Sequence, residues 1–214
     1  MSRASTPAVM SARRTAQRGE PAWEVALLFP NQGHWTEAEY LALDTNRLVE
    51  LSDGCLEVLP WPTIFHQLVA GFLYTMLDTF VTSHAAGMVL FAPLPVRLWA
   101  GKFREPDIMY LRPGRVRDLH GQPDGADLAM EVVSEGAENR DRDLNIKRQE
   151  YAAAGIPEYW IVDPQEQRIT VLVLDGQTYR VHGEFGPGTQ ATSVLLPGFT
   201  VAVEAVFAAG QGSR

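Results

Sequence analysis

Cysteine is almost absent from this chain, which has Cys55 as the single thiol among its 214 residues. One cysteine excludes an internal disulfide and a cysteine-rich zinc site, and it fits a protein of the reducing cytoplasm. Four of the five histidines show no ligand spacing with one another, which argues against a histidine zinc site. The chain also lacks a glycine-rich loop of the P-loop or dinucleotide-binding type, so nucleotide binding of those two kinds is not expected.

Long hydrophobic runs are lacking as well. No apolar run approaches the ~20 residues that a membrane span needs, so we expect no membrane partner. The N-terminal segment contains basic and small residues without the apolar stretch of a secretory signal, and we predict a disordered tail over residues 1–20. The remaining composition is typical of one globular domain over residues 21–207, followed by a C-terminal tail over residues 208–214.

The net charge of −8 argues mildly against a protein that coats nucleic acid. The charge is uneven, however, because residues 97–117 contain six basic side chains and only two acidic ones. Such a basic segment is compatible with a phosphate-bearing substrate. A solvated loop explains the same segment equally well.

Hydrophobic patterning predicts a mixed α/β fold of the α+β kind, in which a sheet is flanked by helices. Thr36 is expected to cap a short helix, and an Asp53-Gly54 turn is expected to close a hairpin. The most apolar helix is expected to be largely buried, and the residues between the strands that end at Trp99 and begin at Glu105 are expected to form a basic loop. The predicted helices cover residues 36–45 and 63–84, and the predicted strands and hairpins cover residues 48–59, 88–92, 94–99, 105–111, 168–185 and 195–207.

The segment from Asp127 to Pro164 predicts a strand, a helix and a second strand, with two charged residues in unusual places. Glu131 lies inside a strand whose two faces are both apolar, where an ionised carboxylate is costly without a partner. On the helix, Lys147 occupies a position at which the apolar stripe calls for a hydrophobic residue. A misplaced acid and a misplaced base in adjoining elements suggest a functional site.

Asp107 begins the preceding strand, 24 residues before Glu131. Neighbouring strands lie ~4.8 Å apart, so both carboxylates can reach one cation. Two carboxylates and water suit Mg²⁺, and Lys147 would approach the same point from the helix. The alternative is a purely structural ion pair between Glu131 and Lys147.

Three segments in order resemble the Uma family of restriction-endonuclease-like proteins, within the PD-(D/E)XK nuclease superfamily. These are PDIMYL, LAMEVVS and NIKRQEYAAAGIPEYWIVDP, and the resemblance covers roughly residues 36–207. It implies a restriction-endonuclease-like fold, with a central mixed sheet flanked by helices and additional β-hairpins. It also implies a Mg²⁺-dependent endonuclease, with Mn²⁺ as a possible substitute, that acts in the cytoplasm on nucleic acid, DNA foremost, and that can work as a homodimer.

The resemblance assigns the two metal-ligand roles to Asp107 and Glu131. It departs at Val133, where the superfamily has lysine, and we transfer the lysine role to Lys147 as the residue that positions or activates water. Burial and a nearby metal ion are expected to lower the pKa of Lys147. The departure leaves open a degenerate, non-catalytic protein that binds nucleic acid or another protein, and hydrolysis of a small phosphorylated molecule is a third reading.

Further residues could support this site. His66, at the start of the apolar helix, could approach the metal or a phosphate, although a lone histidine in such a helix is more often a core residue. Glu57, on the first hairpin, could supply another acid, but strand alternation favours a solvent-facing position as much. Glu105 would share a face with Asp107 if the strand has already begun there.

Overall fold

The computed structural model describes residues 30–43 and 48–212. The predicted tail over residues 1–20 lies outside the described residues. The first described helix, α1 (Glu37–Leu41), has Thr36 as its N-cap in a capping box with Glu39, as the sequence predicts. It is shorter than the predicted helix, because Ala42 already forms its C-cap.

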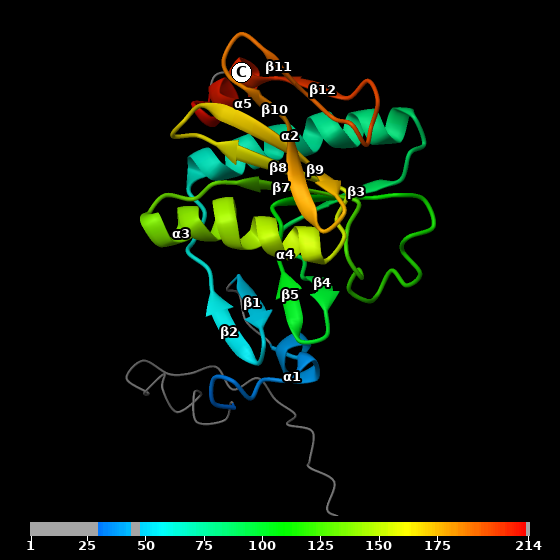
Figure 1. The fold of residues 1–214 in the computed structure, drawn as a ribbon, viewed down its shortest axis with the longest axis vertical. Helices are drawn as coiled ribbons and strands as arrows, with labels where there is room; N and C mark the ends of the chain where they lie inside the picture. The colour runs from blue at the N-terminus through cyan, green and yellow to red at the C-terminus, as the bar shows by residue number, and fades with distance from the viewer. Residues whose placement is uncertain (1–29, 44–47, 213–214) are drawn as a thin grey trace, which may run out of the picture.

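The central sheet has six strands in the order β10-β9-β8-β7-β6-β3. Its middle pair, β7 and β8, is parallel and its other pairs are antiparallel, so the sheet is mixed as predicted (Figure 1). The pairing of Ile108 with Met130 places Asp107, the next residue outward, opposite Glu131. The strands are β3 (Met88–Phe91), β6 (Ile108–Leu111), β7 (Leu128–Val132), β8 (Glu158–Asp163), β9 (Arg168–Asp175) and β10 (Thr178–Phe185).

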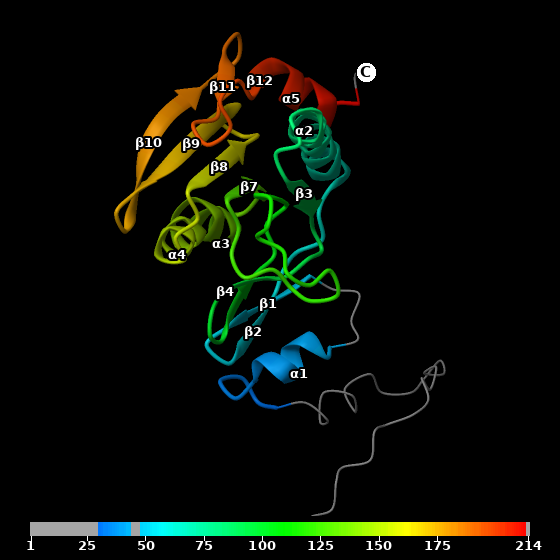
Figure 2. The same cartoon turned by 90° about the vertical axis from the view of Figure 1, so that its right-hand side faces the viewer.

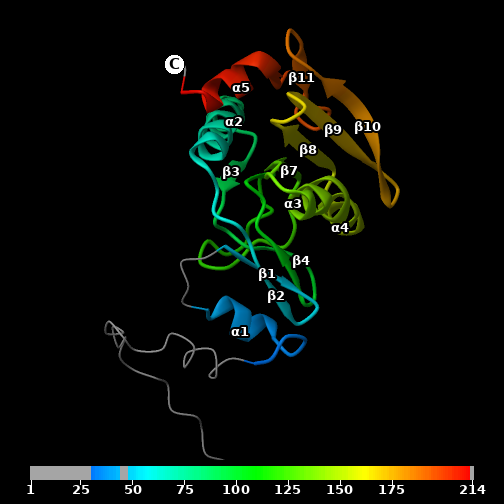
Figure 3. The same ribbon diagram turned by 90° about the vertical axis from the view of Figure 1, so that its left-hand side faces the viewer.

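Helices cover both faces of this sheet (Figures 2 and 3). On one face, α2 (Ile64–Ser83) and α5 (Val203–Gly210) pack on a core that includes every second residue of β7. On the other face lie α3 (Ala137–Asp141), the π-helical segment η3 (Arg142–Ile146) and α4 (Lys147–Ala153). A small sheet of β11 (Gln190–Thr192) and β12 (Thr200–Ala202) precedes α5. Helix α5 extends three residues past the predicted domain end at residue 207.

A second sheet of four antiparallel strands lies beside the first, in the order β2-β1-β5-β4. Its hairpin turns at Asp53 and Gly54, which both have positive φ, and a Cβ at position 54 would lie 2.7 Å from the carbonyl oxygen of Gly33. Glycine is therefore required in the predicted turn. The strands are β1 (Val49–Ser52), β2 (Cys55–Val58), β4 (Val96–Trp99) and β5 (Lys102–Arg104).

Strand β5 corrects the prediction of a solvated basic loop. Lys102 and Arg104 are buried rather than exposed, because carboxylates from β1, β2 and α4 pair with them. A basic residue whose partner lies about 50 positions away in the sequence cannot be told from a solvated one by local pattern.

Helix α2 corrects a second prediction. Only the residues that follow one another at four-residue intervals are fully buried, while Ile64 and Met76 are exposed. By length and composition, α2 is also apolar enough to cross a membrane, contrary to the expectation from the sequence. A single helix of this kind is weak evidence for a span, and its buried face packs on the core of the central sheet through Val69, Leu73, Leu77 and Val81.

Candidate functional site

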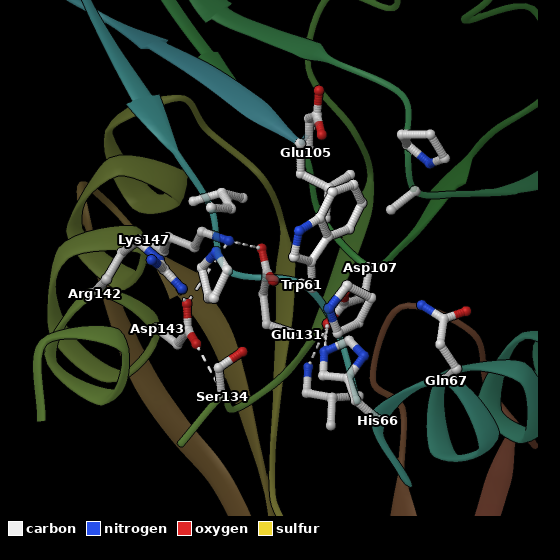
Figure 4. A pocket seen from close by; sticks show the side chains of 17 residues that line it. Trp61, His66, Gln67, Glu105, Asp107, Glu131, Ser134, Arg142, Asp143 and Lys147 are labelled. Atoms are coloured by element: carbon white, nitrogen blue, oxygen red, sulfur yellow. Dashed lines mark hydrogen bonds and ion pairs between the residues drawn. The ribbon is translucent and has the colours of Figure 1, made fainter. Parts of the chain in front are cut away.

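A cavity of about 270 Å³ opens at the ends of β6 and β7, between the two sheets. The three residues predicted to be catalytic, Asp107, Glu131 and Lys147, all line it (Figure 4). They come from three elements, because Asp107 precedes β6, Glu131 lies in β7 and Lys147 begins α4. The other polar and aromatic residues of the lining are Trp61, His66, Gln67, Glu105, Ser134, Arg142 and Asp143.

Asp107 is held by a backbone group and by a side chain. Its Oδ2 accepts a hydrogen bond from the amide of Val132 at 2.8 Å and lies 3.2 Å from Nε2 of His66. Burial opposes the charged form of His66, but the hydrogen bond and charge of Asp107 raise the pKa of the imidazole. The first turn of α2 thus brings His66 to the cavity, where it orients one of the two predicted metal ligands.

Glu131 is 3% exposed and bonds to the helix above it. Its Oε1 accepts hydrogen bonds from Nζ of Lys147 at 2.7 Å and from the hydroxyl of Tyr151 at 2.6 Å. Burial raises the pKa of Glu131 above its ordinary range, because Lys147 offsets only part of the lost hydration and Asp107 adds a like charge. The positive charge around Glu131 is therefore too small to stabilise its ionised form fully.

Lys147 does not behave as the sequence suggested. Its ammonium lies 3.6 Å from Glu50 and 3.8 Å from Asp143, in addition to its bond to Glu131. Burial alone would lower the pKa of Lys147, but these three carboxylates raise it well above the ordinary value. This shift is opposite to the lowering that the sequence analysis expected, because that analysis did not count the three neighbouring carboxylates.

The π-helical segment η3 contributes two residues that the sequence analysis missed, Arg142 and Asp143. Asp143 accepts a hydrogen bond from the amide of Ser134 at 3.2 Å and is bonded to Nε of Arg142 at the same distance. Its carbonyl accepts the hydroxyl of Tyr159 at 2.8 Å. A π-helical segment inside a helix shifts the face on which later side chains emerge. The polar residues of η3 do not by themselves indicate a π-helical segment in the sequence.

The donor set fits a divalent cation. Among the described residues, the buried atoms Nδ1 of His66 and Oε2 of Glu105 have no hydrogen-bond partner, and both side chains line the cavity. Burial, followed by the charge of Glu50, raises the pKa of Glu105 to about 7. Carboxylates outnumber cations in this lining: Glu105, Asp107, Glu131 and Asp143 stand against Arg142 and Lys147.

This set is not a ready-made metal cage. Within residues 30–43 and 48–212, no group of three or more histidine, cysteine or acidic side chains is placed to hold a metal ion. Mg²⁺ commonly binds through one or two carboxylates and completes its shell with water and substrate phosphate. Asp107 and Glu131 would be sufficient protein ligands for that kind of site.

One candidate residue lies outside the cavity, and one residue that was not a candidate lines it. Glu57 does not line the cavity, since it lies on β2 and pairs with Arg104. Trp61 lines the cavity, although the sequence analysis did not consider it. Its signal was the run Pro60-Trp61-Pro62, in which an aromatic residue lies in a connection rather than in an element.

Comparisons with known proteins give the family and the fold of the chain. The family model Uma2, described as "Putative restriction endonuclease", matches residues 37–204. Among solved structures, the fold is similar to that of a protein from Anabaena variabilis ATCC 29413 described as "a putative nuclease belonging to DUF820", with a TM-score of 0.67 and 17% identity. The match covers 82% of this chain and 99% of that chain. No curated protein matches this chain. The fold is restriction-endonuclease-like, as the resemblance implied.

Proposed function

The chain belongs to the Uma2 family, and from that premise we propose that it is a metal-dependent nuclease that hydrolyses phosphodiester bonds of nucleic acid. The observation that carries the proposal is the convergence of Asp107, Glu131 and Lys147 in one cavity from three separate segments. A structural ion pair would need only Glu131 and Lys147. It would explain neither the second carboxylate nor the unpartnered polar atoms around it.

Asp107 and Glu131 are the proposed ligands of Mg²⁺ or Mn²⁺. The cation would supply charge that stabilises the phosphate in the transition state and that acidifies water. His66 keeps Asp107 in position through its Nε2, and Tyr151 and Lys147 keep one oxygen of Glu131 in position. Preorganised ligands of this kind lose little free energy on reordering when the cation binds.

Lys147 acts in this proposal as a cation and not as a base. The carboxylates of Glu131, Glu50 and Asp143 raise its pKa against the effect of burial, and this favours the protonated ammonium. A buried ammonium beside the phosphate would instead stabilise the negative charge that develops on the phosphate oxygens, or orient the attacking water. This role does not depend on the position two residues after Glu131, which Val133 occupies here.

The test is metal-dependent cleavage of supercoiled plasmid and of single-stranded oligonucleotides. We expect cleavage in Mg²⁺ or Mn²⁺ but none in EDTA, and a loss of at least ~100-fold in Glu131→Gln, because an amide is a poor ligand for a hard cation. Glu166→Gln is the matched control, since it makes the same change at a half-exposed residue outside the cavity.

The main rival is a degenerate, non-catalytic protein that binds nucleic acid or another protein. The acidic net charge and Val133 favour it. Nucleic-acid binding without cleavage in either metal, or equal cleavage by wild type and Glu131→Gln, would replace the nuclease proposal with this one.

A further inference from the structure

A second cavity, of about 600 Å³, adjoins the first. The two spaces meet along a shared wall, because six residues line both cavities: Pro60, Trp61, Pro62, His66, Val132 and Ser134. The second cavity continues toward Arg140 and Gln165, which the proposed chemistry does not use. Its volume lies in the range of ~300–1,000 Å³ that is typical of small-molecule sites.

Trp61 is the feature of this shared wall that calls for an explanation. It is 65% exposed, although a tryptophan side chain has a large apolar surface whose burial is favourable. Pro60 and Pro62 flank it, and each proline restricts its own φ and the backbone conformation of the residue before it. Thr63 then caps α2, so the segment that carries the indole is anchored at the start of a long helix. Figure 4 shows the indole among the side chains that line the first cavity.

The depth of the first cavity limits which phosphate can reach it. Glu131 and Lys147 are 3% and 2% exposed, so the proposed chemistry takes place at the bottom of a cavity and not on an open surface. Double-stranded DNA is stiff over short lengths, so a phosphate of its backbone cannot leave the double helix to enter a deep cavity. A single strand can enter with one phosphate, because its bases are free to unstack and leave the axis.

Two polar side chains of the second cavity are already engaged. Arg140 donates two hydrogen bonds to Asp163, at 3.0 and 2.7 Å. Asn139 donates to the carbonyl of Glu135 and accepts from Arg142. Neither is available to read the edge of a base without breaking these bonds. The exposed indole of Trp61 offers a base a large flat surface, and stacking on such a surface tolerates any base.

We propose that the substrate is a single strand of nucleic acid, with one unstacked base on Trp61 in the second cavity and the adjoining phosphate in the first. This inference rests on the proposed function for the location of the phosphate. It adds the class of substrate and a residue that binds it.

The test measures affinity separately from cleavage. Fluorescence anisotropy of the full chain in the Glu131→Gln background would compare labelled single-stranded DNA, single-stranded RNA of the same sequence, and the corresponding duplex. We expect the single strands to bind more tightly than the duplex, and Trp61→Ala to weaken single-strand binding by ~10–100-fold, the usual effect of removing a stacking platform.

Two controls accompany this substitution. Trp61→Phe keeps an aromatic face and should stay within ~3-fold of the parent affinity. Leu119→Ala removes an exposed apolar side chain that lies outside both cavities and should leave affinity unchanged. Thermal melts establish that each variant is folded, and because Trp61 is exposed we expect its replacement to be tolerated.

The outcomes separate the two proposals. Equal affinities of Trp61→Ala and Leu119→Ala, or tighter binding of the duplex, would overturn the stacking site even if metal-dependent cleavage is observed. Loss of single-strand affinity in Trp61→Ala, without metal-dependent cleavage by the wild type, would retain the binding site and overturn the nuclease. No binding of any nucleic acid would overturn both.

Discussion

Two buried clusters of charge lie side by side in this protein, and they are built in opposite ways. The Arg104 cluster consists of Glu50, Glu57, Lys102, Arg104 and Glu150. The cavity cluster consists of Glu105, Asp107, Glu131, Asp143 and Lys147. Both are mostly removed from solvent and both combine strands with α4 or the segment before it, yet only the second borders a cavity.

The Arg104 cluster is saturated. The guanidinium of Arg104 bonds to Glu50 at 2.6 Å and to both oxygens of Glu150 at 2.7 and 2.9 Å. Burial opposes the ionised form of Glu50, but Lys147 and Arg104 outweigh it and lower the pKa of that carboxyl. The cations and hydrogen-bond donors of this cluster are enough to stabilise its carboxylates in their ionised form. Because these residues come from β1, β2, β5 and α4, the cluster holds the four-stranded sheet to α4.

The cavity cluster is unsaturated. The pKa values of Glu105 and Glu131 are raised where that of Glu50 is lowered, and Oε2 of Glu105 has no partner among the described residues. Burial of charge therefore does not distinguish the two clusters. The excess of acids beside the cavity does distinguish them, and the proposed cation site rests on that excess.

The largest expected effect is on the saturated cluster. Arg104→Met would leave Glu50 and Glu150 without their main partner, and breaking a buried ion pair typically costs about 3–5 kcal/mol. We expect the free energy of unfolding, measured by urea denaturation, to fall by that amount. A loss below about 1 kcal/mol would mean that the cluster does not stabilise the fold, and the comparison would fail.

The next effect concerns the unsaturated cluster and the cation that we propose it binds. Mg²⁺ or Mn²⁺ should stabilise the wild type, by about 1.4 kcal/mol at a concentration ten times the dissociation constant. Glu131→Gln should abolish this gain, while Glu166→Gln should keep it. Thermal melts over a metal titration measure the effect, and equal stabilisation of both variants would place the cation outside the cavity.

The smallest expected effect is at Asp163, a buried carboxylate that belongs to neither cluster. Burial opposes ionisation of Asp163, but two hydrogen bonds from Arg140 outweigh it and lower the pKa. A lowered pKa contributes stability above the ordinary aspartate value of about 4, and this contribution is lost as pH falls through the folded value.

Asp163→Asn should therefore cost about 1 kcal/mol of unfolding free energy at pH 7. The difference from wild type should shrink as the pH falls below about 4. Urea denaturation at a series of pH values measures it. A difference that stays constant with pH would show that the carboxylate charge contributes nothing.

Local pattern predicted the elements whose signals are themselves local. The cap at Thr36 and the turn at Asp53 and Gly54 follow from the chemistry of single residues. The strand that contains Glu131 and the helix that begins at Lys147 follow from apolar periodicity, and each exception to that periodicity lines the cavity. Glu131 and Lys147, the charged residues at positions where the pattern predicts apolar ones, thus indicated where the cavity lies.

The sequence analysis failed where a residue's environment depends on partners far away in the sequence. The burial of Lys102 and Arg104 depends on acids that lie 46–54 positions away from them, so their strand was taken for a loop. The raised pKa of Lys147 depends on Glu50, on a distant strand, and on Asp143, which η3 turns toward the cavity. Trp61 could not be assigned because the cavities beside it exist only in the folded chain.

The proposed function requires Asp107 and Glu131 to bind one divalent cation between β6 and β7. Crystals soaked in Mn²⁺ and measured at the manganese absorption edge would show whether they do. We predict an anomalous peak in the first cavity, within bonding distance of both Asp107 and Glu131, that is absent from crystals of Glu131→Gln. No peak at millimolar Mn²⁺, or a peak that contacts neither carboxylate, would contradict the account.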